Sequence, residues 1–251
     1  MGDRPPADAE QGAAPTAGVV KALAFDVFGT VVDWRGSLLR ACRRFGRERG
    51  LHADWPGLVD AWRGGYRPAM DRVNAGDLPW MNVDALHRMI LDNLVDTFGL
   101  AHLGEVDRLQ LTHSWHRLRP WPDALPGLRR LRKRHVITTL SNGNMALLVN
   151  MAKQSNLPWD CILSAELVRR YKPDALVYRQ AAAWLGLQPS AVLMVAAHTH
   201  DLEAARAAGL RTAYVHRPFE FGRARPKALP SSADFDHVAS DLLDLAAQLE
   251  A

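Results

Sequence analysis

The chain has 251 residues, of which 48% are hydrophobic and 23% are charged, so it is long enough to bury one large core or a core and a smaller domain. No apolar run approaches the roughly 20 residues that a membrane-spanning helix needs, which argues against a membrane protein. Residues 1–18 lack the basic and apolar regions of a secretory signal, and we expect a disordered tail there.

The charge and the cysteines of the chain exclude two further classes of protein. The net charge is +4, but arginines such as Arg40, Arg43 and Arg44 are scattered over a helical pattern, which is typical of a solvated face and not of nucleic-acid binding. Cys42 and Cys161 lie far apart and in no metal-binding spacing. We therefore expect no nucleic-acid partner, no disulfide framework and a cytoplasmic location.

Short, continuously apolar runs predict strands of a parallel sheet that is covered on both faces. They are Val20–Phe28, Val136–Leu140, Cys161–Ser164, Val192–Ala196 and Thr212–Val215. Helical patterns lie between and after these runs, at Asp123–Arg134, Met145–Gln154, Ala175–Leu185, Leu202–Ala208 and Ser240–Glu250. The alternation predicts an α/β fold with a Rossmann-like parallel sheet flanked by helices.

About 100 residues without a strand-like run separate the first strand from the second, which is too long for a simple connection. Their patterns predict helices at Ser37–Arg49, Pro56–Val73, Val83–Phe98 and Glu105–Leu118, although Gly64, Gly65 and Pro68 disturb the second. We expect a helical cap domain at 35–118, inserted after the first strand, and a core domain formed by 19–34 and 119–251. In open α/β folds, ligands bind at the carboxyl ends of the strands, which such a cap would cover.

Polar side chains follow four of the predicted strands at this edge. Asp26 ends the first, Ser141 and Asn142 follow the second, Lys172 follows the third, and Asp201 follows the fourth. A carboxylate beside a buried apolar run is costly unless partners hold it, so packing alone does not explain the set. The four positions predict a functional site.

With these motifs in this order, the chain resembles the haloacid dehalogenase superfamily over nearly its whole length after the tail. Asp26 matches the nucleophile of the first motif and Thr30 its threonine. Ser141, Lys172 and Asp201 match the second, third and fourth motifs. The resemblance therefore implies the superfamily's Rossmann-like core with a cap, and covalent catalysis by Asp26.

Two departures separate this chain from the phosphatases of the superfamily. Phosphatases resemble Asp-x-Asp in the first motif, where the second Asp protonates the leaving alkoxide, but Phe28 stands at that position here. In the fourth motif, Ala196 and Ala197 stand at the Gly-Asp pair that helps to hold Mg²⁺, and an alanine offers no oxygen ligand. We therefore expect no metal and no other cofactor. Because a halide leaves as a weak base, its displacement needs neither group.

An aromatic residue in the first motif is similar to the type II 2-haloacid dehalogenases. The resemblance extends to Arg63, at the place of their halide-binding arginine, and to Tyr178, six residues past Lys172. His198 resembles a branch that includes enzymes acting on fluoroacetate. The implied reaction is hydrolysis of short 2-haloacids such as chloroacetate, 2-chloropropionate or fluoroacetate, usually the S enantiomer, to 2-hydroxyacids through an aspartyl ester with inversion.

The expected mechanism gives each residue a role. Asp26 attacks, Thr30 and Lys172 orient its oxygens, and Asp201 activates the water. The substrate carboxylate and the halide are bound by the Val27 and Phe28 amides and by Arg63, Ser141, Asn142, Tyr178 and His198.

Alternatives stay open at this point. The chain could be a phosphatase or phosphonatase of the same superfamily, or a non-catalytic member that binds a metabolite or partner. Arg63 could be solvated, Tyr178 could be core packing and His198 could fill a strand end, whereas His200 is expected to be structural. The expected partners are a haloacid and water. Family members are often homodimers, so a homodimer is also considered, although the sequence carries no dimer signature.

Overall fold

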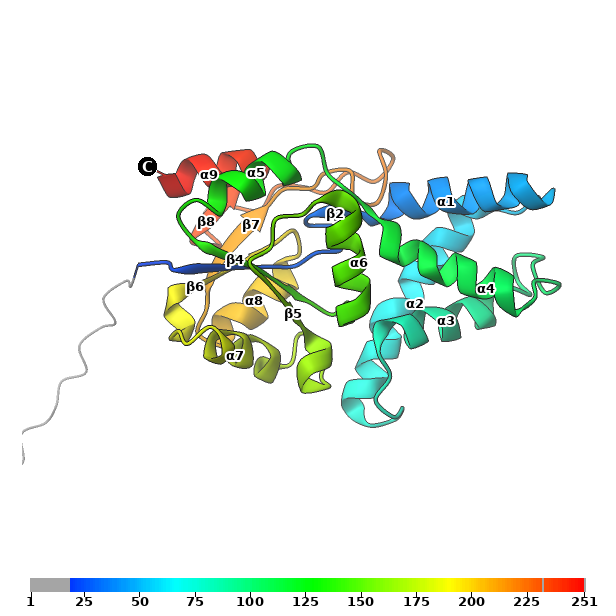
Figure 1. The fold of residues 1–251 in the computed structure, drawn as a ribbon, viewed down its shortest axis with the longest axis horizontal. Coiled ribbons are helices and arrows are strands. Elements are labelled where there is room, and N and C mark those ends of the chain that lie inside the picture. The colour runs from blue at the N-terminus through cyan, green and yellow to red at the C-terminus, as the bar shows by residue number, and fades with distance from the viewer. Residues whose placement is uncertain (1–18, 232, 251) are drawn as a thin grey trace, which may run out of the picture.

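The computed structural model of the protein describes residues 19–231 and 233–250, and the predicted tail at 1–18 lies outside them. A six-stranded parallel sheet forms its centre, in the order β5-β4-β1-β6-β7-β8 (Figure 1). The strands are β1 (Ala22–Phe25), β4 (Val136–Ser141), β5 (Cys161–Ser164), β6 (Val192–Ala196), β7 (Arg211–Val215) and β8 (His237–Ala239). The predicted Rossmann-like α/β fold is confirmed.

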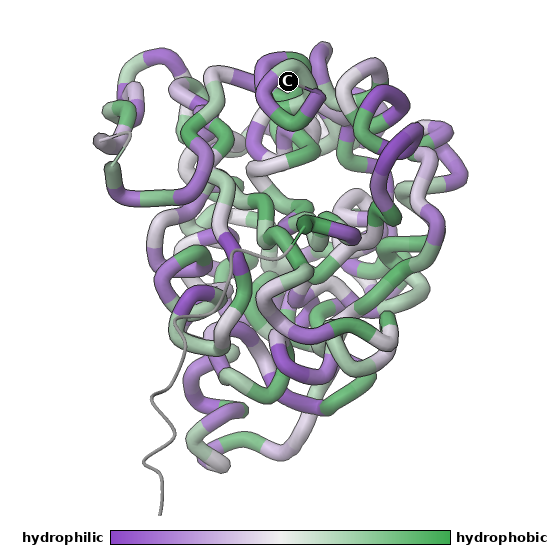
Figure 2. The backbone as a smooth tube through the Cα atoms, turned by 90° about the vertical axis from the view of Figure 1, so that its left-hand side faces the viewer, coloured by the Kyte–Doolittle hydropathy of each residue, from purple (hydrophilic) through white to green (hydrophobic). Residues whose placement is uncertain are grey.

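The helices of the core lie on the two faces of this sheet. They are α5 (Ala124–Leu131), α6 (Met145–Ser155), α7 (Ala175–Trp184), α8 (Thr199–Ala207) and α9 (Leu242–Glu250), with short 3₁₀ turns at Ala165–Val168 and Pro189–Ala191. Figure 1 shows α5 and α9 together on one side of the sheet and α7 and α8 on the other. Hydrophobic and hydrophilic stretches alternate along the helical tubes in Figure 2, as expected for helices that bury one face.

Four helices stand between β1 and β4, as predicted. They are α1 (Trp34–Arg49), α2 (Trp55–Ala75), α3 (Val83–Leu94) and α4 (Glu105–Thr112), followed by a 3₁₀ turn at His113–Arg117. Side chains of Asp33, Asp54 and Asn82 cap the first three by accepting hydrogen bonds from backbone N–H groups. These helices gather at one end of the sheet in Figure 1.

Helix α2 corrects one expectation about the insertion. Gly64, Gly65 and Pro68 do not break it, and the helix runs from Trp55 to Ala75. Proline removes one backbone donor, but the buried apolar residues on either side of it hold both halves in one helix. Val83–Phe98 and Glu105–Leu118 were predicted too long, since α3 ends at Leu94 and α4 at Thr112.

Three short strands were not predicted from the sequence. Besides β8, β2 (Val32–Asp33) and β3 (Arg119–Pro120) pair antiparallel at the two ends of the helical insertion. The expectation that about 100 residues without a strand separate the first predicted strand from the second was therefore wrong near the two ends of that stretch. Two residues are too few for a period-2 pattern, and these strands form because the fold brings them together.

The core lies around β1, whose four residues are fully buried between β4 and β6. Among the residues that the model describes, no helix has both the length and the apolar character needed to cross a membrane.

Candidate active site

Asp26 leaves the carboxyl end of β1 at the centre of the sheet. Its backbone N–H donates to the Val195 carbonyl, which fixes the turn that follows the strand. The carboxylate is 7% exposed and has three partners. Its Oδ2 accepts hydrogen bonds from Thr30 Oγ1 at 2.7 Å and His198 Nδ1 at 3.2 Å, and its Oδ1 accepts one from Lys172 Nζ at 3.2 Å.

Lys172 joins Asp26 to Asp201. Its ammonium donates to Asp201 Oδ2 at 2.5 Å, and all three side chains are almost completely buried. Burial alone would lower the pKa of Lys172, but Asp201 and Asp26 outweigh it and raise that pKa above its ordinary value. The backbone N–H of Lys172 donates to Asn142 Oδ1 at 2.8 Å, so the second motif holds the third in place.

The pKa of Asp26 lies well below its ordinary value. Burial would raise it, but the charge of Lys172, the hydrogen bond and charge of His198, and the hydrogen bond of Thr30 together outweigh burial. Asp26 is therefore held as a carboxylate, the form a nucleophile needs.

Tyr178 does more than pack. Its hydroxyl donates to Asp201 Oδ1 at 2.6 Å from a fully buried ring on α7. Asp201 thus has a fixed donor on each oxygen, Tyr178 on one and Lys172 on the other.

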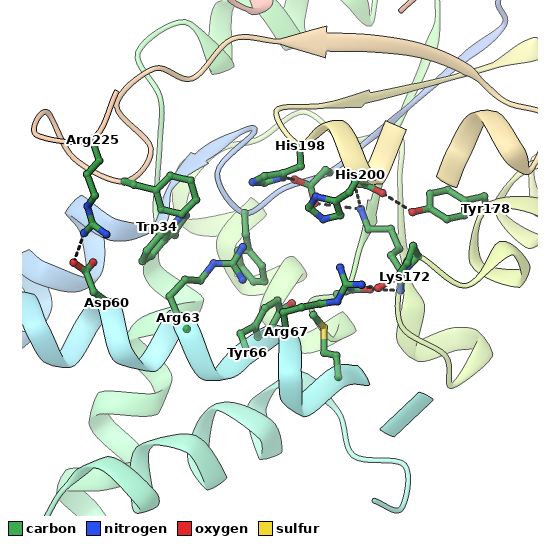
Figure 3. A pocket seen from close by; sticks show the side chains of 18 residues that line it. Trp34, Asp60, Arg63, Tyr66, Arg67, Lys172, Tyr178, His198, His200 and Arg225 are labelled. Carbon is green, nitrogen blue, oxygen red and sulfur yellow. Dashed lines mark hydrogen bonds and ion pairs between the residues drawn. The ribbon is translucent and has the colours of Figure 1, made fainter. Parts of the chain in front are cut away.

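A cavity of about 420 Å³ opens above Asp26, between the carboxyl edge of the sheet and helix α2. Figure 3 shows Arg63 reaching into it from α2, with Lys172, Tyr178 and His198 on the opposite side. The Arg63 guanidinium lies 4.6 Å from the Tyr66 ring centroid and 5.4 Å from that of Trp34. Within the described parts of the chain it has no ion pair, so it is available to an anion.

The model brings most of the predicted site residues to this cavity. It is lined by Asp26, Phe28, Arg63, Asn142, Lys172, Tyr178, His198 and Asp201. Thr30 contacts Asp26 from behind and is completely buried. Ser141 is also completely buried and does not line the cavity, and its Oγ accepts from the Gly143 N–H at 3.1 Å.

The residues at this position do not suit a magnesium ion. The Lys172 ammonium already lies between the carboxylates of Asp26 and Asp201, and Ala197 supplies no oxygen. Over the described ranges, no group of three or more His, Cys, Asp and Glu side chains is arranged to hold a metal. Phe28 likewise offers no proton where a phosphatase of this superfamily would need one.

Comparison with known proteins agrees with this geometry. A model of the haloacid dehalogenase-like hydrolases matches residues 20–209. The chain belongs to this family of hydrolases. The family expected from the motif order is therefore confirmed.

Several relatives of this hydrolase are named dehalogenases. The (S)-2-haloacid dehalogenase of Pseudomonas sp. (strain YL) is 32% identical over 209 residues, which cover 79% of this chain and 83% of that protein. The solved structure of the L-2-haloacid dehalogenase PA0810 is 48% identical with a TM-score of 0.88, and covers 93% of this chain and 99% of its own. That of the defluorinating L-2-haloacid dehalogenase Rha0230 is 41% identical with a TM-score of 0.89, and covers 92% and 96%.

Sequence reasoning missed several residues of the hydrolase's cavity. Tyr66 and Arg67 line it one turn after Arg63, so the helical period could have found them. His200, which was expected to be structural, also lines the cavity. Glu220 carried no sequence signal, yet its carboxylate accepts from His198 Nε2 at 2.9 Å.

Proposed function

We propose that this hydrolase removes halide from short 2-haloacids, such as chloroacetate and (S)-2-chloropropionate, and releases 2-hydroxyacids. One observation carries the proposal. Asp26 is a buried carboxylate kept ionised by Lys172, His198 and Thr30. It faces a cavity in which the Arg63 guanidinium has no ion pair within residues 19–231 and 233–250, and in which Phe28 offers no proton. The names of the relatives agree with this substrate class.

In the first step Asp26 attacks the carbon that bears the halogen, in line with the departing halide, which inverts that carbon and forms an aspartyl ester. The attacking oxygen is Oδ1, because it has one hydrogen-bond partner and Oδ2 has two. The carbon–halogen electron pair leaves with the halide, so no proton is needed. Arg63 and Asn142, both at the cavity wall, receive the halide.

The substrate carboxylate is held on the other side of the reacting carbon by the N–H groups of Val27 and Phe28, whereas Ser141 is buried behind the cavity wall. In the part of the chain that the structure describes, those two N–H groups donate to no backbone carbonyl. Free donors in a turn are suited to an anion. Holding both reactants in place would supply several of the roughly 7–11 kcal/mol that proximity and orientation can contribute.

In the second step water attacks Cγ of Asp26 and not the substrate carbon. Asp201 takes the proton of the water, since its carboxylate is fixed by Tyr178 and Lys172 at the same cavity. We further propose that residues 35–118, between β2 and β3, act as a cap that keeps bulk water out. Cys42 and Cys161 form no disulfide, which fits the proposed cytoplasmic location.

The test is chloride release from chloroacetate and from each enantiomer of 2-chloropropionate, with and without a chelator. We expect release from chloroacetate and the S enantiomer, unchanged by the chelator, and none from the Asp26→Asn variant. Fluoride release from fluoroacetate tests the finer proposal, suggested by His198 beside Asp26, that fluoride is also a leaving group. A chelator-sensitive reaction, or no halide from any of these acids, would refute the proposed function.

A further inference from the structure

Glu220 is a buried carboxylate that the reaction above does not use. It lies in the loop after β7 and is 1% exposed. Its Oε1 accepts hydrogen bonds from Trp34 Nε1 at 3.0 Å and His198 Nε2 at 2.9 Å, and its Oε2 accepts one from Lys227 Nζ at 2.9 Å. Burying such a charge is costly even when it is paired, so stability alone does not account for this carboxylate.

The turn of the first motif leaves room for this carboxylate. Gly29 adopts a φ of 87°, and a Cβ built on it would lie 2.2 Å from Glu220 Oε1. Only glycine allows both that backbone conformation and that approach. The turn at Gly29 and the Glu220 carboxylate are therefore sterically complementary, although they lie 191 residues apart in the sequence.

The two ring nitrogens of His198 each face a carboxylate. Nδ1 lies 3.2 Å from Asp26 Oδ2, and Nε2 lies 2.9 Å from Glu220 Oε1. A neutral imidazole has one N–H and would turn a lone pair toward one of the two anions. Only the imidazolium donates to both.

We infer that Glu220 is a positioning residue that keeps His198 as an imidazolium, and that His198 and Thr30 form the oxyanion hole in which the Asp26 ester is hydrolysed. The inference rests on the proposed function, because it concerns the second step of that reaction. Attack through Oδ1 leaves Oδ2 as the carbonyl oxygen of the ester, and Oδ2 is the atom that Thr30 and His198 contact.

Water oxygen bonds to Cγ of Asp26, its proton goes to Asp201, and the carbonyl electron pair moves onto Oδ2. When the pair returns, the bond from Cγ to Oδ1 breaks and the hydroxyacid oxygen takes the proton from Asp201. Asp26 is left as a carboxylic acid and releases its proton to solvent, which matches the acid formed with the halide.

Other charged groups around His198 do not remove this effect. Around the ring lie Asp26 from the turn after β1, Glu220 and Lys227 from the loop after β7, and His200 from α8. The same cavity is lined by Lys172, Asp201, Arg63, Arg67 and Arg225. Burial would lower the pKa of His198, but Glu220 and Asp26 raise it to about 9. Burial would raise the pKa of Glu220, but His198 and Lys227 lower it to about 2.

The variant Glu220→Gln tests the inference through its dependence on pH. With an ordinary histidine pKa near 6.5, about 3% of His198 would be charged at pH 8 and most of it at pH 6. Glu220 keeps its charge beside Nε2 throughout the reaction, so in the unmutated protein His198 stays mostly charged at both pH values. Ester hydrolysis should therefore slow by up to about 30-fold at pH 8 and by less than about 2-fold at pH 6. Removing one oxyanion donor typically lowers kcat by about 100- to 1000-fold, so a 30-fold slowing is no larger than the loss of one such donor would cause.

The measurement is rapid-quench turnover of chloroacetate, with chloride and the mass of the Asp26 peptide followed together. We expect Glu220→Gln at pH 8 to give a burst of chloride and a retained ester on Asp26. The matched control is Lys227→Met, which removes another partner of the Glu220 carboxylate but leaves its bond to His198. The rate of ester hydrolysis in Lys227→Met, divided by that of the wild type, should be the same at pH 6 and pH 8.

The outcomes separate this inference from the proposed function. No ester and no chloride from the wild-type protein would refute the function. Suppose that the wild type releases chloride, and that the rate of ester hydrolysis in Glu220→Gln, divided by that of the wild type, is the same at pH 6 and pH 8. That result would refute the inference alone. An NMR titration of His198 in the unmutated protein needs no variant, and a pKa below 7 would also overturn the inference.

Discussion

Replacing Lys172 by methionine should destabilise the protein strongly at neutral pH. The lysine joins two buried carboxylates, at 3.2 Å from Asp26 Oδ1 and 2.5 Å from Asp201 Oδ2, and methionine would leave both carboxylates buried without their cation. Removing one partner of a buried ion pair costs about 3–5 kcal/mol. For a chain of this size each kcal/mol lowers Tm by about 2–4 °C, so we expect a loss of roughly 10 °C.

The loss should depend on pH with a definite sign. Pairing holds the pKa of Asp26 in the folded protein well below the ordinary value of 3.8, so its stabilisation is fully present above 3.8 and is lost progressively as pH falls from there toward the lowered pKa. In Lys172→Met the charge that lowers the pKa of Asp26 is gone, so Asp26 should bind a proton at a higher pH, which relieves its repulsion with Asp201. The difference in free energy of unfolding between wild type and variant is therefore largest near pH 7 and shrinks toward pH 4.

The assay is urea unfolding of wild type and variant at several pH values between 4 and 7.5. The matched control is Lys133→Met, at an exposed lysine without an ion pair in the described structure, which should change the free energy of unfolding by less than about 0.5 kcal/mol. A Lys172→Met variant that loses less than about 1 kcal/mol at pH 7, or a loss that does not shrink on acidification, would refute the reasoning.

Two further predictions concern single contacts in the cavity. Tyr178→Phe removes the 2.6 Å hydrogen bond to Asp201 and should slow turnover by about 10- to 150-fold, in line with about 1.5–3 kcal/mol for a hydrogen bond to a charged group, and steady-state chloride release checks it. Unchanged turnover would mean that the hydroxyl does not orient Asp201. Arg63→Met should lower kcat/KM for chloroacetate by more than tenfold, whereas Arg63→Lys should recover part of it, because lysine keeps the charge but not the planar stacking on Tyr66 and Trp34. A kcat/KM equal to that of the wild type in both variants would show that the halide is received elsewhere.

The sheet was predictable because its strands are buried on both faces. Val192–Ala196 and Cys161–Ser164 were predicted with the bounds that the model gives, since a continuous apolar run has one simple solution in a parallel sheet. The pair β2 and β3 was not predictable, because two-residue strands depend on tertiary contact and leave no period in the sequence.

The residues of the site also fall into those that the sequence predicts and those that it does not. Asp26, Lys172 and Asp201 each follow a strand, and parallel strands bring their carboxyl ends to one edge, so strand order alone placed them near one another. Glu220 lies in an irregular loop, and its contact with Trp34 joins residues 186 positions apart. No local pattern encodes such a contact. Its detection required the folded chain.

The central claim is that Asp26 forms a bond to the carbon of the substrate and is regenerated by water. Single-turnover hydrolysis of chloroacetate in ¹⁸O-labelled water, with enzyme in excess, tests it most directly. We predict that the label enters the Asp26 carboxylate and that the glycolate produced carries none. Label in the glycolate hydroxyl and none in Asp26 would mean that water attacks the substrate directly, and it would contradict the account.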